Sequence, residues 1–213
     1  MKTKSIQKSA PAASKIDLIK IHKADYAAPK KPVLLDIKPA RYLVVDGEGK
    51  PGGDVFQARI GALYAMAYTV KMTRKFGGQQ DYTIGKLEGR YLNLDRQPLP
   101  KMDAWRWQLL IRTPDIVAKA ELEKAVAALR KRGKEGDAAL VRLEDIHEGL
   151  CVQILHVGPY DQVAPTIEIM CNFAKTQGMR FSGPHHEIYI SDPRRVEPAK
   201  LKTILRLPVS RSG

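Results

Sequence analysis

The sequence has too few cysteines for a disulfide framework or a zinc finger. Its 213 residues include two cysteines, Cys151 and Cys171, without the paired spacing of a zinc site. Two isolated thiols fit a reducing cytoplasm, although the sequence leaves open a disulfide between them. No apolar run approaches the ~18 residues of a membrane helix, and the basic first residues lack the apolar stretch of a secretory signal. We therefore expect a cytoplasmic protein that does not cross a membrane.

Sequence signatures of phosphate, metal and thiol chemistry are also missing. The glycine-rich stretch DGEGKPGG (46–53) lacks the Gly-Lys-Ser/Thr ending of a phosphate-binding loop. The pair His185-His186 precedes Glu187, but on a strand His185 and Glu187 share a face that His186 does not, so the pattern offers two ligands at most. The cysteines lie in apolar stretches, where a reactive thiolate is not expected. We predict no metal and no cofactor.

Acidic residues are outnumbered, and the formal net charge is +13. Residues 1 to 32 hold eight lysines against Asp17 and Asp25, and RKRGK (130–134) forms a second basic cluster. No helix-turn-helix or RNA-binding signature accompanies them, which favours a solvated tail over specific nucleic-acid binding. Residues 1–14 are predicted to be disordered, because their Ser, Ala, Pro and Lys side chains offer little apolar surface to bury.

Four elements of the first half of the chain recur in the same order in the second half. In the first half the pattern predicts a strand at 40–49, a helix at 56–76, and strands at 81–92 and 104–114. In the second half it predicts a strand at 150–160, a helix at 163–178, and strands at 183–193 and 201–209. The repeat predicts an α+β fold of two pseudo-symmetric βαββ repeats, with antiparallel sheets, helices on one face and a ligand cleft between the repeats.

The repeat also sets expected boundaries and equivalences. One domain is expected over 15–213, divided into repeat one (about 33–114), a connecting helix (115–133) and repeat two (about 138–209). LIRTP in the first half matches ILRLP in the second, which makes Arg112 equivalent to Arg206. Each third element contains a glutamate, so Glu88 is predicted to be equivalent to Glu187.

Residues 15 to 209 resemble the GyrI-like small-molecule-binding family. The resemblance is carried by YLVVDGEGKPGG, LYAMAYTVK, DYTIGKLEGRY, WRWQLLIRTPD, HVGPYDQVAPTI, HHEIYISDPRR and LKTILRLPV. It implies two βαββ units that face each other. The family's glutamate before its Asp-Pro falls on Glu187, and the glutamate of its Leu-Glu-Gly falls on Glu88. Many stand-alone members carry Trp where this chain has Arg90 and Tyr91. The resemblance therefore does not predict which aromatic side chains line the ligand site.

The resemblance implies several functions. Family members include effector-binding halves of multidrug-responsive regulators, where a buried glutamate meets cationic aromatic drugs, a gyrase inhibitor, and stand-alone hydrolases of cyclopropanoid genotoxins. We expect a cytoplasmic binding protein for hydrophobic, often cationic aromatic molecules. The alternative is a hydrolase of cyclopropanoid or similar electrophilic compounds, and a gyrase-inhibitor-like role is less favoured. The sequence leaves open whether the protein is an enzyme, and it gives no helix-turn-helix upstream of the matched region.

Glu187 is the expected charge partner of the ligand. A carboxylate that faces an apolar cleft must be paired, protonated or bound to a ligand, because burying an unpaired charge costs several kcal/mol. The alternative is a purely structural role, in which Glu187 forms a salt bridge to one of three arginines: Arg112, Arg194 or Arg206. Glu88 is expected to contribute less to ligand binding, because Lys86 and Arg90 lie next to it in the sequence and neutralise it.

The expected aromatic walls come from three elements. Tyr64 and Tyr68 lie four residues apart on one helix face, Trp105 and Trp107 share a strand face, and Tyr189 shares a face with Glu187. For each aromatic the alternative is a place in the core. In the hydrolase alternative, Glu187 would act as a general base or orient water, while Tyr189 or a helix tyrosine would polarise the leaving group.

Overall fold

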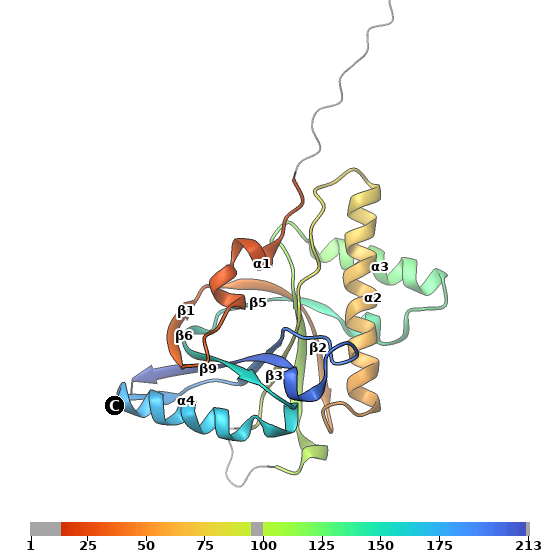
Figure 1. Ribbon diagram of the computed structural model, residues 1–213. Coiled ribbons are helices and arrows are strands. Elements are labelled where there is room, and N and C mark those ends of the chain that lie inside the picture. The colour runs from red at the N-terminus through yellow and green to blue at the C-terminus, as the bar shows by residue number, and fades with distance from the viewer. Residues whose placement is uncertain (1–13, 95–99, 212–213) are drawn as a thin grey trace, which may run out of the picture.

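Nine strands and four α-helices make up the regular structure of residues 14–94 and 100–211, the part of the chain that this computed structural model describes (Figure 1). The strands are β1 (Val33–Ile37), β2 (Ala40–Glu48), β3 (Leu87–Tyr91), β4 (Arg106–Arg112), β5 (Arg142–Ile146), β6 (Gly149–Val157), β7 (Met179–Phe181), β8 (His185–Tyr189) and β9 (Lys202–Arg211). The helices are α1 (Leu18–Ile21), α2 (Asp54–Phe76), α3 (Lys119–Lys131) and α4 (Ala164–Thr176), and a 3-10 turn, η1 (Lys23–Tyr26), follows α1. Apart from Ser14, the tail that was predicted to be disordered lies outside the described residues.

The strands form one continuous antiparallel sheet in a symmetric order. The order is β1-β6-β9-β8-β3-β4-β2-β5, and β7 pairs with the end of β9. Repeat one contributes β2, α2, β3 and β4, and repeat two contributes β6, α4, β8 and β9 in the corresponding places. The predicted α+β fold with a βαββ repeat is therefore confirmed. The two sheets of the repeats are joined into one where β3 pairs with β8.

The outer strands β1 and β5 are exchanged between the halves. β1 precedes β2 in the chain but pairs with β6, and β5 precedes β6 but pairs with β2. Each half of the sheet therefore ends in a strand that belongs, by sequence, to the other half. The predicted βαββ repeat did not include β1 or β5. The alternation of apolar residues along a strand does not show which strand it pairs with, so the exchange could not be predicted.

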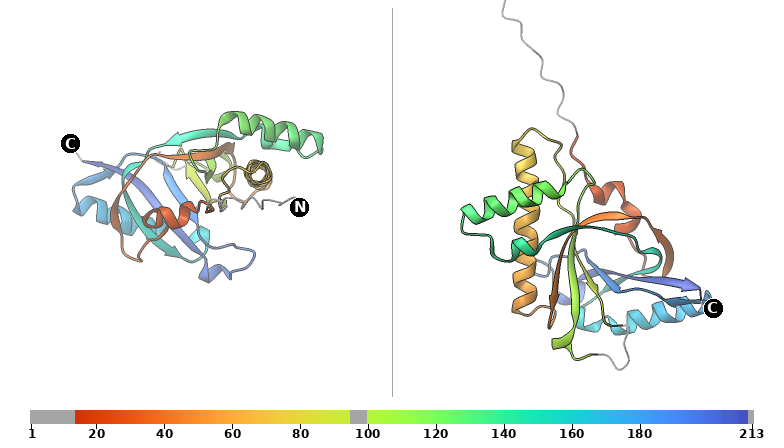
Figure 2. Two further views of the ribbon diagram at one scale, coloured as in Figure 1. Left: turned by 90° about the horizontal axis from the view of Figure 1, so that it is seen from above. Right: turned by 180° about the vertical axis from the view of Figure 1, so that it is seen from behind.

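Helices α2 and α4 cover the same face of the sheet at its two ends (Figures 1 and 2). Helix α2 begins after Gly53, carries Asp54 in its first turn and ends at Gly77. It buries Leu63, Met66 and Val70 against β2 and β4. Helix α4 packs on β6 and β7 above a smaller apolar cluster. The middle strands β3 and β8 therefore lie between the two helices.

The opposite face of the sheet is met by the N-terminal segment, which the repeat pattern did not describe. Its short helix α1 is capped at its N-terminus by Asp17, whose side chain accepts a hydrogen bond from the backbone of Lys20. The turn η1 follows and places Tyr26 against Ile188 of β8 and Ile204 of β9. One face of the central strands thus lies on the side of α2 and α4, and the other lies against the N-terminal segment. The glutamates of β3 and β8 therefore have different neighbours if they point to different faces.

Candidate functional site

Glu187 lies in the middle of an apolar row that crosses the sheet. Directly opposed residues share a face, and the row on the helix-covered face consists of Val45, Leu109, Gly89, Glu187, Leu205 and Ile154. Glu187 is the one charged residue in this row, and it is 6% exposed. A buried carboxylate among apolar neighbours needs a partner, so its contacts define the candidate site.

The partner of Glu187 is its strand neighbour His185. The Nε2 atom of His185 lies 2.9 Å from Oε1 of Glu187 and donates a hydrogen bond to it. The two side chains point to the same face because they are two residues apart on β8. The imidazole ring of His185 lies 5.9 Å from the ring of Tyr91 on the adjacent strand. The carboxylate is thus paired with an imidazole, a partner that the sequence analysis had not assigned to it.

Two tyrosine hydroxyls meet beside the carboxylate. The hydroxyl of Tyr189 lies 2.9 Å from that of Tyr91, and the ring of Tyr160 packs edge-on to Tyr189 at 5.4 Å. A Cβ atom on Gly89 would lie 3.0 Å from the Tyr189 hydroxyl. Glycine at this position therefore lets the hydroxyl of Tyr189 approach β3.

The tyrosine hydroxyls of the site remain protonated at neutral pH. Burial raises the pKa of Tyr189 well above its usual value, and Glu187 and Tyr91 raise it further. Burial and Glu187 also raise the pKa of Tyr91 well above its usual value. Protonated phenols beside a carboxylate can donate hydrogen bonds to it or to a ligand.

The predicted helix tyrosines face a loop of repeat two. The rings of Tyr64 and Tyr68 lie 6.2 Å apart on α2, where Tyr64 is half-buried and Tyr68 is 55% exposed. Burial and Tyr68 raise the pKa of Tyr64, and Asp192 and Arg194 are close enough to act on it as well. The loop after β8 therefore reaches toward α2, across the middle of the helix-covered face.

The two predicted tryptophans have different places. Trp105 is half-buried and meets Tyr91 edge-on at 5.8 Å, which brings it next to the site. Trp107 is 1% exposed, packs on Phe56 at 4.8 Å and donates a hydrogen bond to the carbonyl of Gly49 at 2.9 Å. Trp107 therefore belongs to the core beneath α2, and it does not extend the aromatic surface around Glu187.

Glu88 lies on the opposite face of the sheet, so its predicted equivalence with Glu187 is wrong. Glu187 opposes Gly89, whereas Glu88 opposes Ile188, and neighbouring positions on a strand point to opposite faces. Glu88 is fully buried and accepts a hydrogen bond from the hydroxyl of Tyr26 at 2.9 Å. A shift of one residue between the repeats was enough to reverse the side of the sheet.

The neighbours predicted to neutralise Glu88 are also not its partners. Lys86 donates to the carbonyl of Ile190 and Arg90 donates to the side chain of Gln108. Instead, Nε2 of His186 lies 3.0 Å from Oε2 of Glu88, at an angle outside that of a hydrogen bond.

The salt-bridge alternative for Glu187 does not hold, because each candidate arginine pairs with another carboxylate. Arg112 pairs with Asp25 at 2.7 Å, Arg206 with Glu148 at 3.0 Å and Arg194 with Asp192 at 2.9 Å. Arg112 and Arg206 lie on the face of Glu88, in corresponding strands of the two repeats. Their shared face is consistent with the predicted equivalence of these two arginines.

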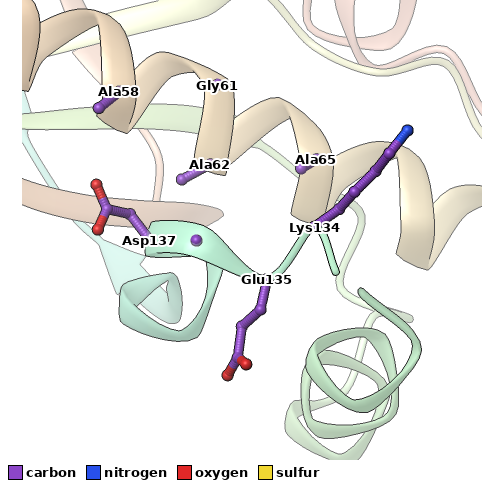
Figure 3. Close-up of a pocket in the computed structure, with 8 residues that line it drawn as sticks. Ala58, Gly61, Ala62, Ala65, Lys134, Glu135 and Asp137 are labelled. Carbon is purple, nitrogen blue, oxygen red and sulfur yellow. The ribbon is translucent and has the colours of Figure 1, made fainter. Parts of the chain in front are cut away.

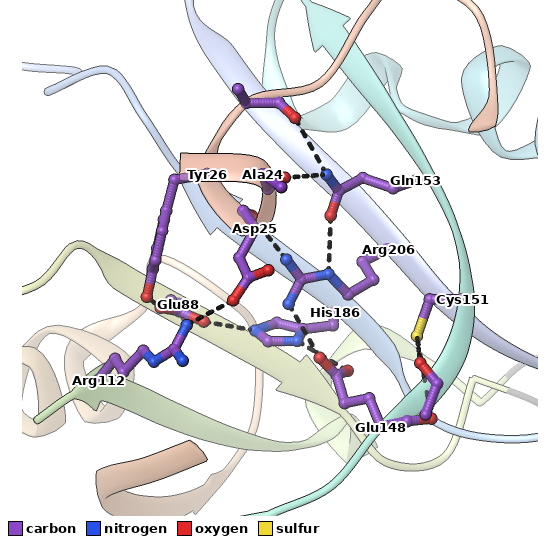
Figure 4. Close-up of polar contacts among 12 residues, drawn as sticks. Ala24, Asp25, Tyr26, Glu88, Arg112, Glu148, Cys151, Gln153, His186 and Arg206 are labelled. Carbon is purple, nitrogen blue, oxygen red and sulfur yellow. Dashed lines mark hydrogen bonds and ion pairs between the residues drawn. The ribbon is translucent and has the colours of Figure 1, made fainter. Parts of the chain in front are cut away.

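A buried polar network fills the face opposite Glu187 (Figure 4). His186 lies between Glu148, at 2.9 Å from Nδ1, and Glu88. Arg206 donates to Glu148, to Gln153 at 2.8 Å and to the carbonyl of Asp25 at 2.7 Å. The sequence analysis missed this network because Asp25 and Glu148 lie outside the predicted elements of the repeat.

The charges of this network shift each other's titration. Burial alone would raise the pKa of Glu148, but His186 and Arg206 outweigh it and hold the pKa at about 2. Burial alone would lower the pKa of His186, but Glu148 and Glu88 outweigh it and raise the pKa. Glu148 is therefore ionised at neutral pH, its neighbours favour the charged form of His186, and the network ties the two repeats together.

Two depressions of the surface lie away from Glu187. One, of about 320 Å³, lies between the small residues of α2 and residues 134–137 (Figure 3). The other, of about 280 Å³, lies between β6 and α4 and is lined in part by His156 and Ile169. Within the described ranges, no three His, Cys, Asp or Glu side chains are placed to hold a metal ion. No helix among these residues is long and apolar enough to cross a membrane.

Comparisons with known proteins identify the family. Residues 115–210 match the family model of the GyrI-like small molecule binding domain. A crystal structure of a hydrolase from Listeria innocua is 40% identical, covers 92% of this chain and 100% of its own, and has a TM-score of 0.84. The chain belongs to the GyrI-like family. It therefore carries a small-molecule-binding domain.

Other solved structures share the fold of this GyrI-like protein. An uncharacterised conserved protein from Listeria innocua is 41% identical, with 92% and 100% of the two chains covered and a TM-score of 0.86. The C-terminal domain of EcmrR is 12% identical, with 85% and 98% covered and a TM-score of 0.57, and shows the fold alone. None of the curated proteins matches the chain.

Proposed function

We propose that this GyrI-like protein is a cytoplasmic receptor for hydrophobic, often cationic aromatic small molecules. The observation that carries the proposal is the place of Glu187, a buried carboxylate at the centre of an otherwise apolar row, with aromatic side chains around it. The site would lie where the repeats meet, between α2 and α4. The matched small-molecule-binding domain supports the proposal.

Charge and aromatic surface together favour a lipophilic cation. Coulomb attraction to a carboxylate is stronger where water is excluded, and an aromatic face adds roughly 0.5–2 kcal/mol to the binding of a cation. In this proposal Glu187 supplies the charge, and the walls are formed by Tyr64, Tyr68, Trp105 and Tyr189. The proposed site does not include Glu88, which lies on the opposite face of the sheet, or Trp107, which lies in the core.

A fluorescence screen tests this function. Purified protein would be titrated with a set of cationic aromatic dyes and a set of neutral dyes of similar size. Saturable binding with a preference for the cationic set supports the proposal. Saturable binding of the neutral set with no gain for the cationic set would contradict it, since the charge of Glu187 would then play no part.

A second candidate function is hydrolysis of cyclopropanoid or similarly strained electrophiles. Two observations favour it: a 40% identical protein is described as a hydrolase, and protonated tyrosine hydroxyls lie next to a carboxylate. Glu187 would act as general base toward water, and Tyr189 would donate a proton to the leaving group. Mass spectrometry of a cyclopropanoid compound incubated with the protein would reveal a product with one added water. Equal product formation by the Glu187→Gln variant would exclude this mechanism.

A further inference from the structure

His185 has features that a mere core histidine would not combine. It is 7% exposed, and its Nε2 atom donates to Glu187 at 2.9 Å. Its Nδ1 atom is buried and has no hydrogen-bond partner among the described residues. A buried imidazole is normally bonded at both nitrogens, so the ring is held by Glu187 and by its packing on Tyr91. The single polar interaction of this ring is thus directed at the proposed ligand-binding carboxylate.

The other buried histidines of the described residues have a polar partner within 3.2 Å of each ring nitrogen. His156 lies between Thr166, at 2.8 Å, and the carbonyl of Pro159, at 3.2 Å. His186 lies between Glu148 and Glu88 on the far face. Their roles are to satisfy buried groups within the fold. His185 differs from both because its one partner belongs to the candidate site.

We propose that His185 is the positioning residue of this site and that it sets the preference for cationic ligands. Its Nε2–H fixes Oε1 of Glu187, so the carboxylate keeps one orientation and presents its other oxygen to the ligand. A carboxylate without a donor in an apolar row would rotate or turn away, and its charge would no longer meet the ligand at a defined place. The inference rests on the proposed binding function.

Substitutions can separate hydrogen bonding from packing at this position. His185→Gln keeps an N–H donor at nearly the same distance from the backbone as Nε2. His185→Phe keeps a flat ring against Tyr91 but has no donor. His156→Phe is the matched control, since it removes a buried, hydrogen-bonded histidine away from Glu187. The probes are rhodamine 6G, a lipophilic cation, and Nile red, a neutral dye.

We expect the phenylalanine variant to lose affinity for the cationic dye selectively, and the glutamine variant to retain it. His185→Phe should weaken binding of rhodamine 6G by roughly 10- to 100-fold, the range for losing a hydrogen bond to a charged group, and should change Nile red by about twofold or less. His185→Gln should stay within about threefold of wild type for both dyes. His156→Phe should leave the ratio of the two affinities unchanged, whatever it does to stability.

Several outcomes would overturn the inference. Tighter binding of rhodamine 6G by His185→Phe would show that His185 acts as a competing positive charge. If His185→Phe weakened binding of both dyes equally and His185→Gln did not restore it, His185 would act through packing. Should His185→Phe not fold, His185→Asn replaces it, because its shorter amide cannot reach Oε1.

Failure of the proposed function is recognised separately. If wild type shows no preference for rhodamine 6G over Nile red, or if Glu187→Gln leaves that preference intact, the proposed binding function is wrong. If wild type and Glu187→Gln behave as proposed while His185→Phe keeps the preference, the inference about His185 alone is wrong. In the Glu187→Gln background, adding His185→Phe should have no further effect on the preference.

Discussion

Glu148 is held in its charged form by His186 and Arg206, and the chain's stability at acidic pH should depend on it. Its pKa is lowered from 4.5 to about 2, with burial outweighed by His186 and Arg206. A carboxyl group whose pKa is lower in the folded than in the unfolded chain stabilises the fold at pH values above its unfolded pKa. This stabilisation is lost as the pH falls from 4.5 toward 2. The contribution is on the order of 3 kcal/mol.

Urea unfolding at several pH values checks this assignment. Glu148→Gln should be clearly less stable than wild type at pH 7, and the difference should shrink as the pH falls through this window. The exposed Glu123 serves as the control, and Glu123→Gln should track wild type at every pH. A difference for Glu148→Gln that is constant from pH 7 to pH 3 would show that its charge is not what stabilises the fold.

Gly47 and Trp107 form a close cross-strand pair whose disruption should be costly. The two residues oppose each other on β2 and β4, and a Cβ atom on Gly47 would overlap the indole ring. Gly47→Ala should therefore cost about 1–3 kcal/mol through overpacking. Gly61 in α2 has open space around its Cβ position, so Gly61→Ala should be neutral or add up to about 1 kcal/mol. Thermal melts of both variants measure this contrast, and a Gly47→Ala variant as stable as wild type would contradict it.

Individual residues also show what the sequence could and could not predict. Period-two alternation correctly placed His185, Glu187 and Tyr189 on one face of a strand. It offered no way to fix the offset between repeats, so Glu88 was assigned to the wrong face. Tyr91 was noted only as a departure from the family pattern, because its proximity to Tyr189 arises from the pairing of β3 with β8.

At the scale of elements, the turn η1 joins the two repeats through Asp25. Its carboxylate accepts a hydrogen bond from Arg112 of repeat one, and its carbonyl accepts one from Arg206 of repeat two. Asp25→Ala should cost about 3–5 kcal/mol, because it leaves Arg112 buried without its carboxylate partner. Asp36→Ala removes an exposed partner of Lys38, an ion pair screened by solvent, and should change stability very little. Chemical denaturation compares the two, and similar small losses would show that η1 is not part of the stable core.

The elements themselves were predictable where their apolar pattern was regular. Helices α2 and α4 and strands β2, β4, β6, β8 and β9 fall within or close to their predicted ranges. β3 is shorter than predicted, since residues 81–86 run outside the ladder. The pairing partners of the exchanged strands and the place of η1 were not predictable, because they depend on contacts with the other half of the chain.

At the scale of the whole molecule, the exchange of β1 and β5 should make the two repeats unfold together. Each half of the sheet ends in a strand from the other half, so neither repeat keeps its full sheet alone. Trp105 and Trp107 report on repeat one, whereas far-ultraviolet circular dichroism reports on both. The two signals should give coincident urea transitions. Separate midpoints would show that the repeats are independent folding units.

The central claim concerns the whole site: the charge of Glu187 sets the preference for cationic ligands. Glu187→Gln keeps the shape of the side chain and removes its charge. It should weaken binding of a cationic dye by roughly 1–3 kcal/mol and leave a neutral dye of similar shape nearly unchanged. Stability should change little, because the glutamine oxygen can still accept the hydrogen bond from His185.

The most direct measurement is a titration of both dyes against wild type, Glu187→Gln and Glu88→Gln. Glu88→Gln is the matched control, because Glu88 is also buried but lies on the opposite face. The account predicts that Glu187→Gln loses the preference for the cationic dye and that Glu88→Gln keeps it. Equal weakening of both dyes by Glu187→Gln, or loss of the preference in Glu88→Gln alone, would contradict it.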